Sequence, residues 1–155
     1  MSPTKQTTAL EPVLVAGDWR PAAATDSFRA VDPSTGRARD AIWPVSSWAD
    51  VDAALDAAVR AAEELARLPV ETIARFLERY ADRLAAQADT IVAAAHAETG
   101  LAIRPRLAEA ELPRTLDQLR QAAAAAREQT WRMAMIDTGK NIRSLAVGLG
   151  PVVVF

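Results

Sequence analysis

Apolar residues recur at helical spacing through the middle of the chain, from about residue 47 to residue 130. The first run opens with Ser47-Trp48-Ala49-Asp50, which has the spacing of a helix capping box with Asp in place of Glu. It ends at Leu68-Pro69, because proline disfavours helical backbone in the residue before it. The apolar face of this first predicted helix consists of Val51, Leu55, Ala58, Val59, Ala62 and Leu65.

Three more helices follow from the same periodicity. The second begins near Val70, and the third covers about 88–98 and ends at Gly100, a typical carboxyl-terminal cap. The fourth spans about 106–127, and Pro113 should kink or split it. We expect the face led by Val51, Leu55 and Val59 to pack on the face led by Ile73, Phe76 and Tyr80.

Short extended segments flank the helical region. Val13–Val15 and Trp19-Arg20 surround the turn residues Ala16 to Asp18, which predicts a hairpin. Phe28 and Val31 predict a second extended piece with Ile42-Trp43 as its partner, residues 21–26 are expected to form a loop, and residues 131–143 to be irregular. Such an arm is too short to be stable alone.

The last eight residues, Gly148 to Phe155, place turn residues before an unbroken β-forming run. This pattern is typical of a strand buried on both faces of a parallel sheet. The sequence therefore predicts an α/β fold with a β arm (1–46), a helical bundle (47–130), and a linker with the first strand of an incomplete nucleotide-binding domain (131–155). We expect the strand to begin a unit that this sequence does not contain, so that the chain is the front portion of a nucleotide-dependent enzyme.

Composition narrows the function classes. The net charge is −2 and no basic block stands out, which argues against nucleic-acid binding. The chain shows neither a secretory signal nor a membrane span, so we expect a cytoplasmic protein without a membrane partner. It has no cysteine, which excludes disulfides, thiolate metal ligands and a cysteine nucleophile from these 155 residues.

No internal catalytic constellation emerges from the remaining polar residues. Three acid-first pairs at i, i+4, typical of a solvated salt-bridged face, are Asp56/Arg60, Glu63/Arg67 and Glu71/Arg75. His96 is the only histidine, so a structural role is expected and no metal site is predicted. Gly148 and Gly150 precede the predicted strand rather than follow it, which is the wrong context for a dinucleotide fingerprint.

Several stretches together resemble the N-terminal part of an aldehyde dehydrogenase, in order and spacing across roughly residues 13–155. They are Val15 to Pro21, Phe28 to Gly36 with its Asp32-Pro33-Ser34-Thr35-Gly36 turn, Ala49 to Ala54, Leu68 to Leu84, and Glu98-Thr99-Gly100 with Leu101 where the family has Lys. Arg114-Thr115, Gln118 to Arg120, Ile136 to Thr138, Arg143-Ser144 and Leu149 to Phe155 resemble the NADP-preferring enzymes that oxidise 2-oxoglutarate semialdehyde, although this chain is shorter between Thr138 and Arg143.

The resemblance implies NAD(P) as cofactor, an aldehyde substrate and a homo-oligomer for the complete enzyme. A cysteine attacks the aldehyde, hydride passes to NAD(P), and a glutamate activates water, all from sequence that this chain lacks. No catalytic residue is therefore expected here, and Phe155 is the only candidate cofactor-binding residue. Glu109 and Glu111 fall near a structural cation in some members, but we predict no metal. The alternative function is a stand-alone helical module that binds a protein partner.

Overall fold

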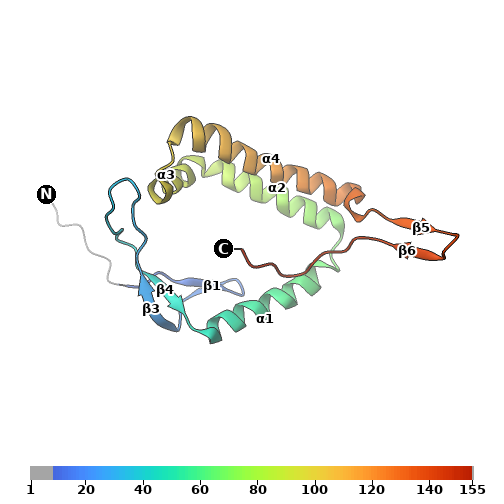
Figure 1. Ribbon diagram of the computed structural model, residues 1–155, viewed down its shortest axis with the longest axis horizontal. Coiled ribbons are helices and arrows are strands. Elements are labelled where there is room, and N and C mark those ends of the chain that lie inside the picture. The colour runs from blue at the N-terminus through green and yellow to red at the C-terminus, as the bar shows by residue number, and fades with distance from the viewer. Residues whose placement is uncertain (1–8, 155) are drawn as a thin grey trace.

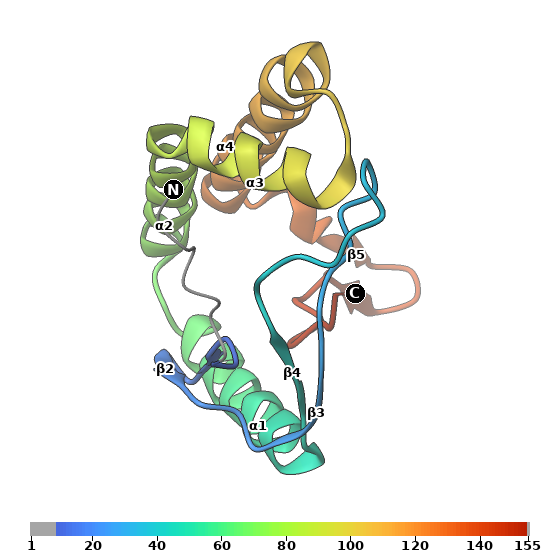
Figure 2. The same ribbon diagram turned by 90° about the vertical axis from the view of Figure 1, so that its left-hand side faces the viewer.

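Two antiparallel helices, α2 (Val70–Ala86) and α4 (Leu112–Glu128), pack along each other at the centre of the helical region (Figure 1). The computed structural model describes residues 9–154, and in it α3 (Ala88–Thr99) crosses one end of this pair (Figure 2). Where α2 and α4 meet, Ala74, Ala81 and Ala123 have no exposed surface. Alanine side chains end at Cβ, so the two helix backbones lie close together.

Helix α1 (Trp48–Leu65) begins where the capping pattern predicts. The Ser47 hydroxyl accepts a hydrogen bond from the Asp50 backbone N–H at 3.4 Å. The expected packing of α1 on α2 is wrong, because α1 diverges from α2 and contacts the β arm through β1 and β4 instead (Figure 1). The β arm takes up the alanine-rich side of α1, which leaves Leu55 and Val59 exposed on its other side.

The β arm consists of two antiparallel hairpins, the predicted one and a second in which Trp43 is the predicted partner of Phe28. Strands β1 (Val13–Val15) and β2 (Asp18–Arg20) are joined by Ala16 and Gly17, whose φ values of 55° and 91° suit a tight hairpin turn. In the second hairpin β3 (Ala24–Phe28) pairs with β4 (Trp43–Ser46), with Phe28 opposite Trp43. Strand β3 thus begins inside the stretch that the sequence predicts as a loop.

The predicted fourth helix is divided near Pro113, as expected. The segment η1 (Ile103–Glu111), in which Arg104 is extended and the rest forms wide helical turns, precedes α4. The Leu112 backbone N–H donates to the Leu107 carbonyl five residues back. Pro113 lies in the first turn of α4, the part of a helix where proline is tolerated.

Residues 131–143 are more regular than predicted. After the short turn η2 (Thr130–Arg132), strands β5 (Met135–Asp137) and β6 (Ile142–Ser144) form a third hairpin (Figure 1). The Asp137 carboxylate accepts the Lys140 backbone N–H at 3.0 Å and holds the turn. Met135–Asp137 and Ile142–Ser144 each contain one β-branched residue, against two in Val13–Val15, so their sequence gives a weaker strand signal.

The buried strand predicted near the carboxyl end is not formed over the residues that the structure describes. Val152, Val153 and Val154 are in no β ladder and are 68%, 60% and 88% exposed. A strand is stabilised by its neighbours in a sheet, and no other described segment pairs with this one. Phe155 lies outside the described residues. No helix within residues 9–154 is long and apolar enough to cross a membrane.

Candidate functional site

The turn Asp32–Gly36, one of the two most recognisable motifs in the sequence, is closed by its own aspartate. The Asp32 carboxylate accepts the Ser34 backbone N–H at 2.8 Å, and the Asp32 carbonyl accepts the Gly36 N–H at 2.8 Å. The hydrogen bond from Ser34 lowers the pKa of Asp32. The aspartate therefore orders this turn, and no substrate-facing role is needed to explain it.

The second motif, Glu98-Thr99-Gly100, ends α3 and packs on the first. Gly100 is left-handed, with φ of 69°, and its N–H bonds the His96 carbonyl. A Cβ added to Gly100 would lie 3.2 Å from Pro33 Cγ and 3.4 Å from Ser34 Oγ. Glycine is thus required at this position both by the backbone and by the neighbouring turn.

Arg39 fastens the loop after the first motif to the end of α3. Its guanidinium donates to the Ala97 carbonyl at 2.8 Å, and its Nε lies 3.1 Å from Glu98 Oε1. A cation at a helix carboxyl end also meets the negative end of the helix dipole. His96 also contacts the residues that follow α3, because its Nδ1 lies 2.7 Å from the Leu101 carbonyl. The two motifs therefore pack on each other as one structural unit.

We expect Gly100→Ala to destabilise the chain by about 1–2 kcal/mol, the usual cost of left-handed backbone for a residue with a Cβ, and by more if Pro33 cannot shift. Gly148→Ala is the matched control, because its added Cβ would meet no atom within 4 Å. Urea denaturation followed by circular dichroism measures both. Equal midpoints for the two variants would contradict the prediction.

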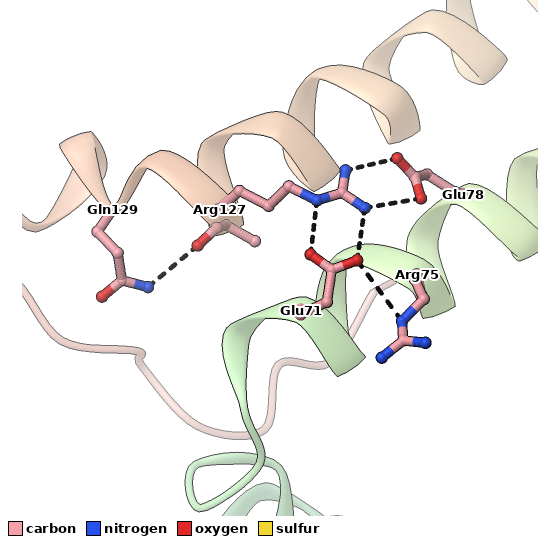
Figure 3. Close-up of polar contacts among 6 residues, drawn as sticks. Glu71, Arg75, Glu78, Arg127 and Gln129 are labelled. Carbon is pink, nitrogen blue, oxygen red and sulfur yellow. Dashed lines mark hydrogen bonds and ion pairs between the residues drawn. The ribbon is translucent and has the colours of Figure 1, made fainter.

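Arg127 makes the densest polar cluster in the described chain, and it joins the carboxyl end of α4 to the first half of α2 (Figure 3). Its guanidinium holds Glu71 through bonds of 2.8 and 3.0 Å and Glu78 through bonds of 2.5 and 2.9 Å. Arg75 Nε lies 3.5 Å from the same Glu71 carboxylate. Hydrogen bonds from Arg127 lower the pKa of both Glu71 and Glu78, and those carboxylates raise the pKa of Arg127.

We expect Arg127→Gln to lower the melting temperature at neutral pH, because two carboxylates lose their shared cation. A lowered folded-state pKa contributes stability above the unfolded value, and that stability is lost as pH falls through the folded value. The ordinary value is 4.5 for Glu71 and Glu78, so the difference between variant and wild type should shrink below it. Melting curves at pH 7 and at about pH 3 test this; a difference that stays constant with pH would contradict it.

Asp50 is the one buried charged residue in the described chain, 5% exposed. Its carboxylate accepts Arg20 Nη2 at 2.7 Å and the Ala23 backbone N–H at 2.6 Å. It does not bond the Ser47 N–H, as a full capping box requires, because that group donates to the Ala23 carbonyl. Asp50 therefore ties the β arm to the start of α1.

Of the three predicted helix-surface pairs, only Glu71/Arg75 lies within ion-pair distance. Within residues 9–154 no three His, Asp or Glu side chains are grouped to hold a metal. Glu109 and Glu111 are paired with Arg104 at 3.2 Å and Arg106 at 2.6 Å, so arginines occupy their carboxylates. These carboxylate–arginine contacts account for the positions of the acids without a catalytic role.

The residues before Phe155 form no cofactor cradle with the other described residues. A Cβ added at Gly148 or Gly150 would meet nothing within 4 Å, so no other described segment lies against these glycines. Val152 to Val154 are exposed and build no wall of a cavity. Phe155, the candidate cofactor-binding residue, lies outside the described residues, so its role stays a prediction.

Sequence reasoning missed Arg127 and the tertiary role of Asp50. A signal for the first exists, since Glu71 and Glu78 are seven residues apart and therefore share one face of α2. Nothing in the sequence shows that the same face meets the end of α4. Asp50 is locally a cap residue, and its partners Arg20 and Ala23 lie too far away in sequence to be inferred.

Comparison with known proteins identifies the family to which these motifs belong. Residues 19–155 match the model of the aldehyde dehydrogenase family. Alpha-ketoglutaric semialdehyde dehydrogenase 2 of Azospirillum brasilense is 38% identical over 144 residues, which cover 86% of this chain and 27% of that protein. The chain therefore spans about a quarter of the length of this relative.

Solved structures show the same fold. An NAD-dependent benzaldehyde dehydrogenase from Corynebacterium glutamicum superposes with a TM-score of 0.72 at 22% identity, over 86% of this chain and 28% of that one. Aldehyde dehydrogenase C of Pseudomonas syringae, a mutant in complex with NAD+ and octanal, has a TM-score of 0.72 at 23% identity, over 83% and 26%. The predicted α/β fold class is confirmed, and the chain belongs to the aldehyde dehydrogenase family.

Proposed function

We propose that this chain is the N-terminal segment of an NAD(P)-dependent aldehyde dehydrogenase that oxidises an aldehyde to a carboxylate. The observation that carries the proposal is the family match over residues 19–155, with the Asp32–Gly36 and Glu98–Gly100 motifs joined in space. The segment supplies the β arm and the helical bundle. Its described residues carry no chemical step, so it is inactive alone.

The exposed apolar surface supports this role. Large side chains such as Leu149, Val154, Met133 and Trp48 are each at least 79% exposed, whereas the buried core consists of Ala74, Ala81, Val92, Leu107 and Ala123. A surface so rich in apolar side chains is typical of one that other protein covers. Nothing in the described residues or the comparisons favours the alternative of a stand-alone interaction module.

The finer assignments follow the most informative resemblance. The 38% identity to an alpha-ketoglutaric semialdehyde dehydrogenase supports 2-oxoglutarate semialdehyde as the aldehyde. The same resemblance underlies our choice of NADP or NAD as the hydride acceptor bound by the complete enzyme. We further propose a homo-oligomer in the cytoplasm, without nucleic-acid or membrane partners, as the charge of −2 and the helix lengths allow.

A chimera tests the proposal. This chain replaces the matching first quarter of the A. brasilense enzyme, and NAD(P)H formation from 2-oxoglutarate semialdehyde is followed by absorbance. We expect activity within about tenfold of the parent, since a misplaced supporting segment costs about a hundredfold. The control is the same chimera with the parent's nucleophilic cysteine replaced by alanine. A soluble, folded chimera without activity would overturn the proposal.

A further inference from the structure

The chain leaves the helical bundle at the carboxyl end of α4, and Arg127 holds that end in place. Arg127 is the last residue but one of α4, and its guanidinium makes four hydrogen bonds, two to Glu71 and two to Glu78 of α2 (Figure 3). A guanidinium is planar and its N–H donors point in fixed directions, so two carboxylates set both its position and its orientation. The last turn of α4 therefore has one defined place on α2.

Gln129 turns the chain away from α4 directly after this helix ends. Its backbone is left-handed, with φ of 58°, which costs free energy for a residue that has a Cβ. Its N–H donates to the Ala125 carbonyl at 3.0 Å, and its side-chain amide donates to the Ala126 carbonyl at 3.0 Å (Figure 3). Both acceptors belong to the last turn of α4, so the conformation of Gln129 depends on the placement of that turn.

The segment after Gln129 is held to this exit by further backbone hydrogen bonds. The Arg132 N–H donates to the Gln129 carbonyl at 3.0 Å, and the Arg132 carbonyl accepts the Ala146 N–H at 2.7 Å. The β5–β6 hairpin lies between Arg132 and Ala146, so it leaves and returns at the same point. A series of hydrogen bonds along the chain thus connects α2 to the segment that leads to Phe155.

A second arginine joins the same two helices without reaching this exit. Arg120 lies seven residues before Arg127, and its Nη2 donates to Asp82 Oδ1 of α2 at 3.3 Å. The two side chains are 52% and 71% exposed, so this pair contributes little to stability. About two turns of helix separate Arg120 from Gln129. Arg120 is therefore the matched control for Arg127, because it links the same helices away from the turn at Gln129.

We propose that Arg127 is a positioning residue for cofactor binding. By fixing the end of α4 on α2, it fixes the turn at Gln129 and thereby the course of residues 146–154 toward Phe155, the candidate cofactor-binding residue. Arg127 acts through this segment and not by contact with the cofactor. A displacement of about 1 Å at a functional site can cost about a hundredfold in rate. The inference rests on the proposed function, because the cofactor belongs to the complete enzyme.

Hydrogen exchange of the full 155-residue chain tests the positioning without cofactor. In Arg127→Gln the N–H groups of Arg132 and Ala146 should exchange at least about tenfold faster than in the wild type, the factor that loss of a hydrogen bond to a charged group can produce. In Arg120→Gln they should stay within about threefold of the wild type, because one exposed pair contributes little. Equal exchange of Ala146 in the two variants would overturn the inference.

The chimera with the A. brasilense enzyme tests the consequence for the cofactor. Its cysteine-to-alanine form allows the binding of NADPH and NADH to be measured by fluorescence without turnover. Arg127→Gln should raise the dissociation constant of the cofactor at least about tenfold, and Arg120→Gln by less than about threefold. In the active chimera Arg127→Gln should raise the KM for NAD(P) while the KM for the aldehyde stays within about twofold. Equal effects on the two KM values would indicate a general loss of structure and overturn the inference.

Two further variants complete the test. If circular dichroism shows that Arg127→Gln does not fold, Arg127→Lys keeps the charge but loses the planar fork, and Ala146 should still exchange faster than in Arg120→Gln. Glu78→Arg/Arg127→Glu exchanges the charges and should bind cofactor more tightly than Arg127→Glu alone, and no recovery would overturn the inference.

The outcomes separate the inference from the proposed function. A folded but inactive chimera without these substitutions would refute the proposed function, and the exchange rate of Ala146 would still decide whether Arg127 fixes the segment. An active chimera in which Arg127→Gln and Arg120→Gln bind cofactor equally would refute the inference alone.

Discussion

The purified 155-residue chain should form no NADH or NADPH from any aldehyde. The assay must be sensitive enough to detect the activity of the chimera described above after a dilution of about a millionfold. Family chemistry needs a thiolate nucleophile, and this chain has no cysteine. Loss of the nucleophile alone costs about a millionfold in a comparable covalent mechanism, so residual turnover is expected below detection. The assay uses 2-oxoglutarate semialdehyde with each cofactor and a heat-killed control. Turnover above that control would contradict the prediction, provided that inhibitors of contaminating dehydrogenases do not abolish it.

Asp50→Ala should destabilise the chain by about 1–3 kcal/mol, the usual cost of leaving a buried donor unpaired. The Ala23 N–H and the Arg20 guanidinium both lose their acceptor, and the β arm loses its tie to α1. Asp52→Ala is the control two residues away, since Asp52 is exposed and unpaired among the described residues, and its effect should stay within about 0.5 kcal/mol.

The measurement is urea denaturation of both variants, combined with hydrogen exchange. Exchange should rise in β1 to β4 of Asp50→Ala while α2 and α4 keep their protection, because the tie lies outside the α2–α4 interface. A loss of protection spread evenly over the helices would show that Asp50 supports the whole fold and not the arm alone. Equal stability of the two variants would contradict the prediction outright.

Helix boundaries set by backbone chemistry were predictable from the sequence. Helix α2 begins at Val70 because Pro69 interrupts the preceding helix, and α3 ends before Gly100 because glycine adopts the left-handed cap. The start of α1 at Trp48 followed from its N-cap, Ser47. In each case one residue constrains its own φ or accepts a local hydrogen bond, so the information lies within a few positions.

What the sequence did not reveal depends on distant partners. The apolar residues of α1 and α2 suggested that these helices pack together, yet α2 packs on α4 because small alanines on both allow close approach. The segment before Phe155 has a strand-like pattern but no pairing partner among the described residues. The division into an arm, a bundle and a partial cofactor domain stays a prediction. The motifs, in contrast, predicted the family correctly, because they lie at tertiary contacts where only certain residue types fit.

Large buried side chains are usually the positions that tolerate substitution least. In the α2–α4 interface the least tolerant positions should instead be the small residues Ala74, Ala81 and Ala123. Positions filled by the smallest side chains leave no space for a longer one, because enlargement pushes two backbones apart along their length. The large exposed residues of α2, such as Phe76, meet no such limit within this chain. Among related sequences, the three alanine positions should therefore vary least. They should vary less than most positions that hold aromatic residues in this chain.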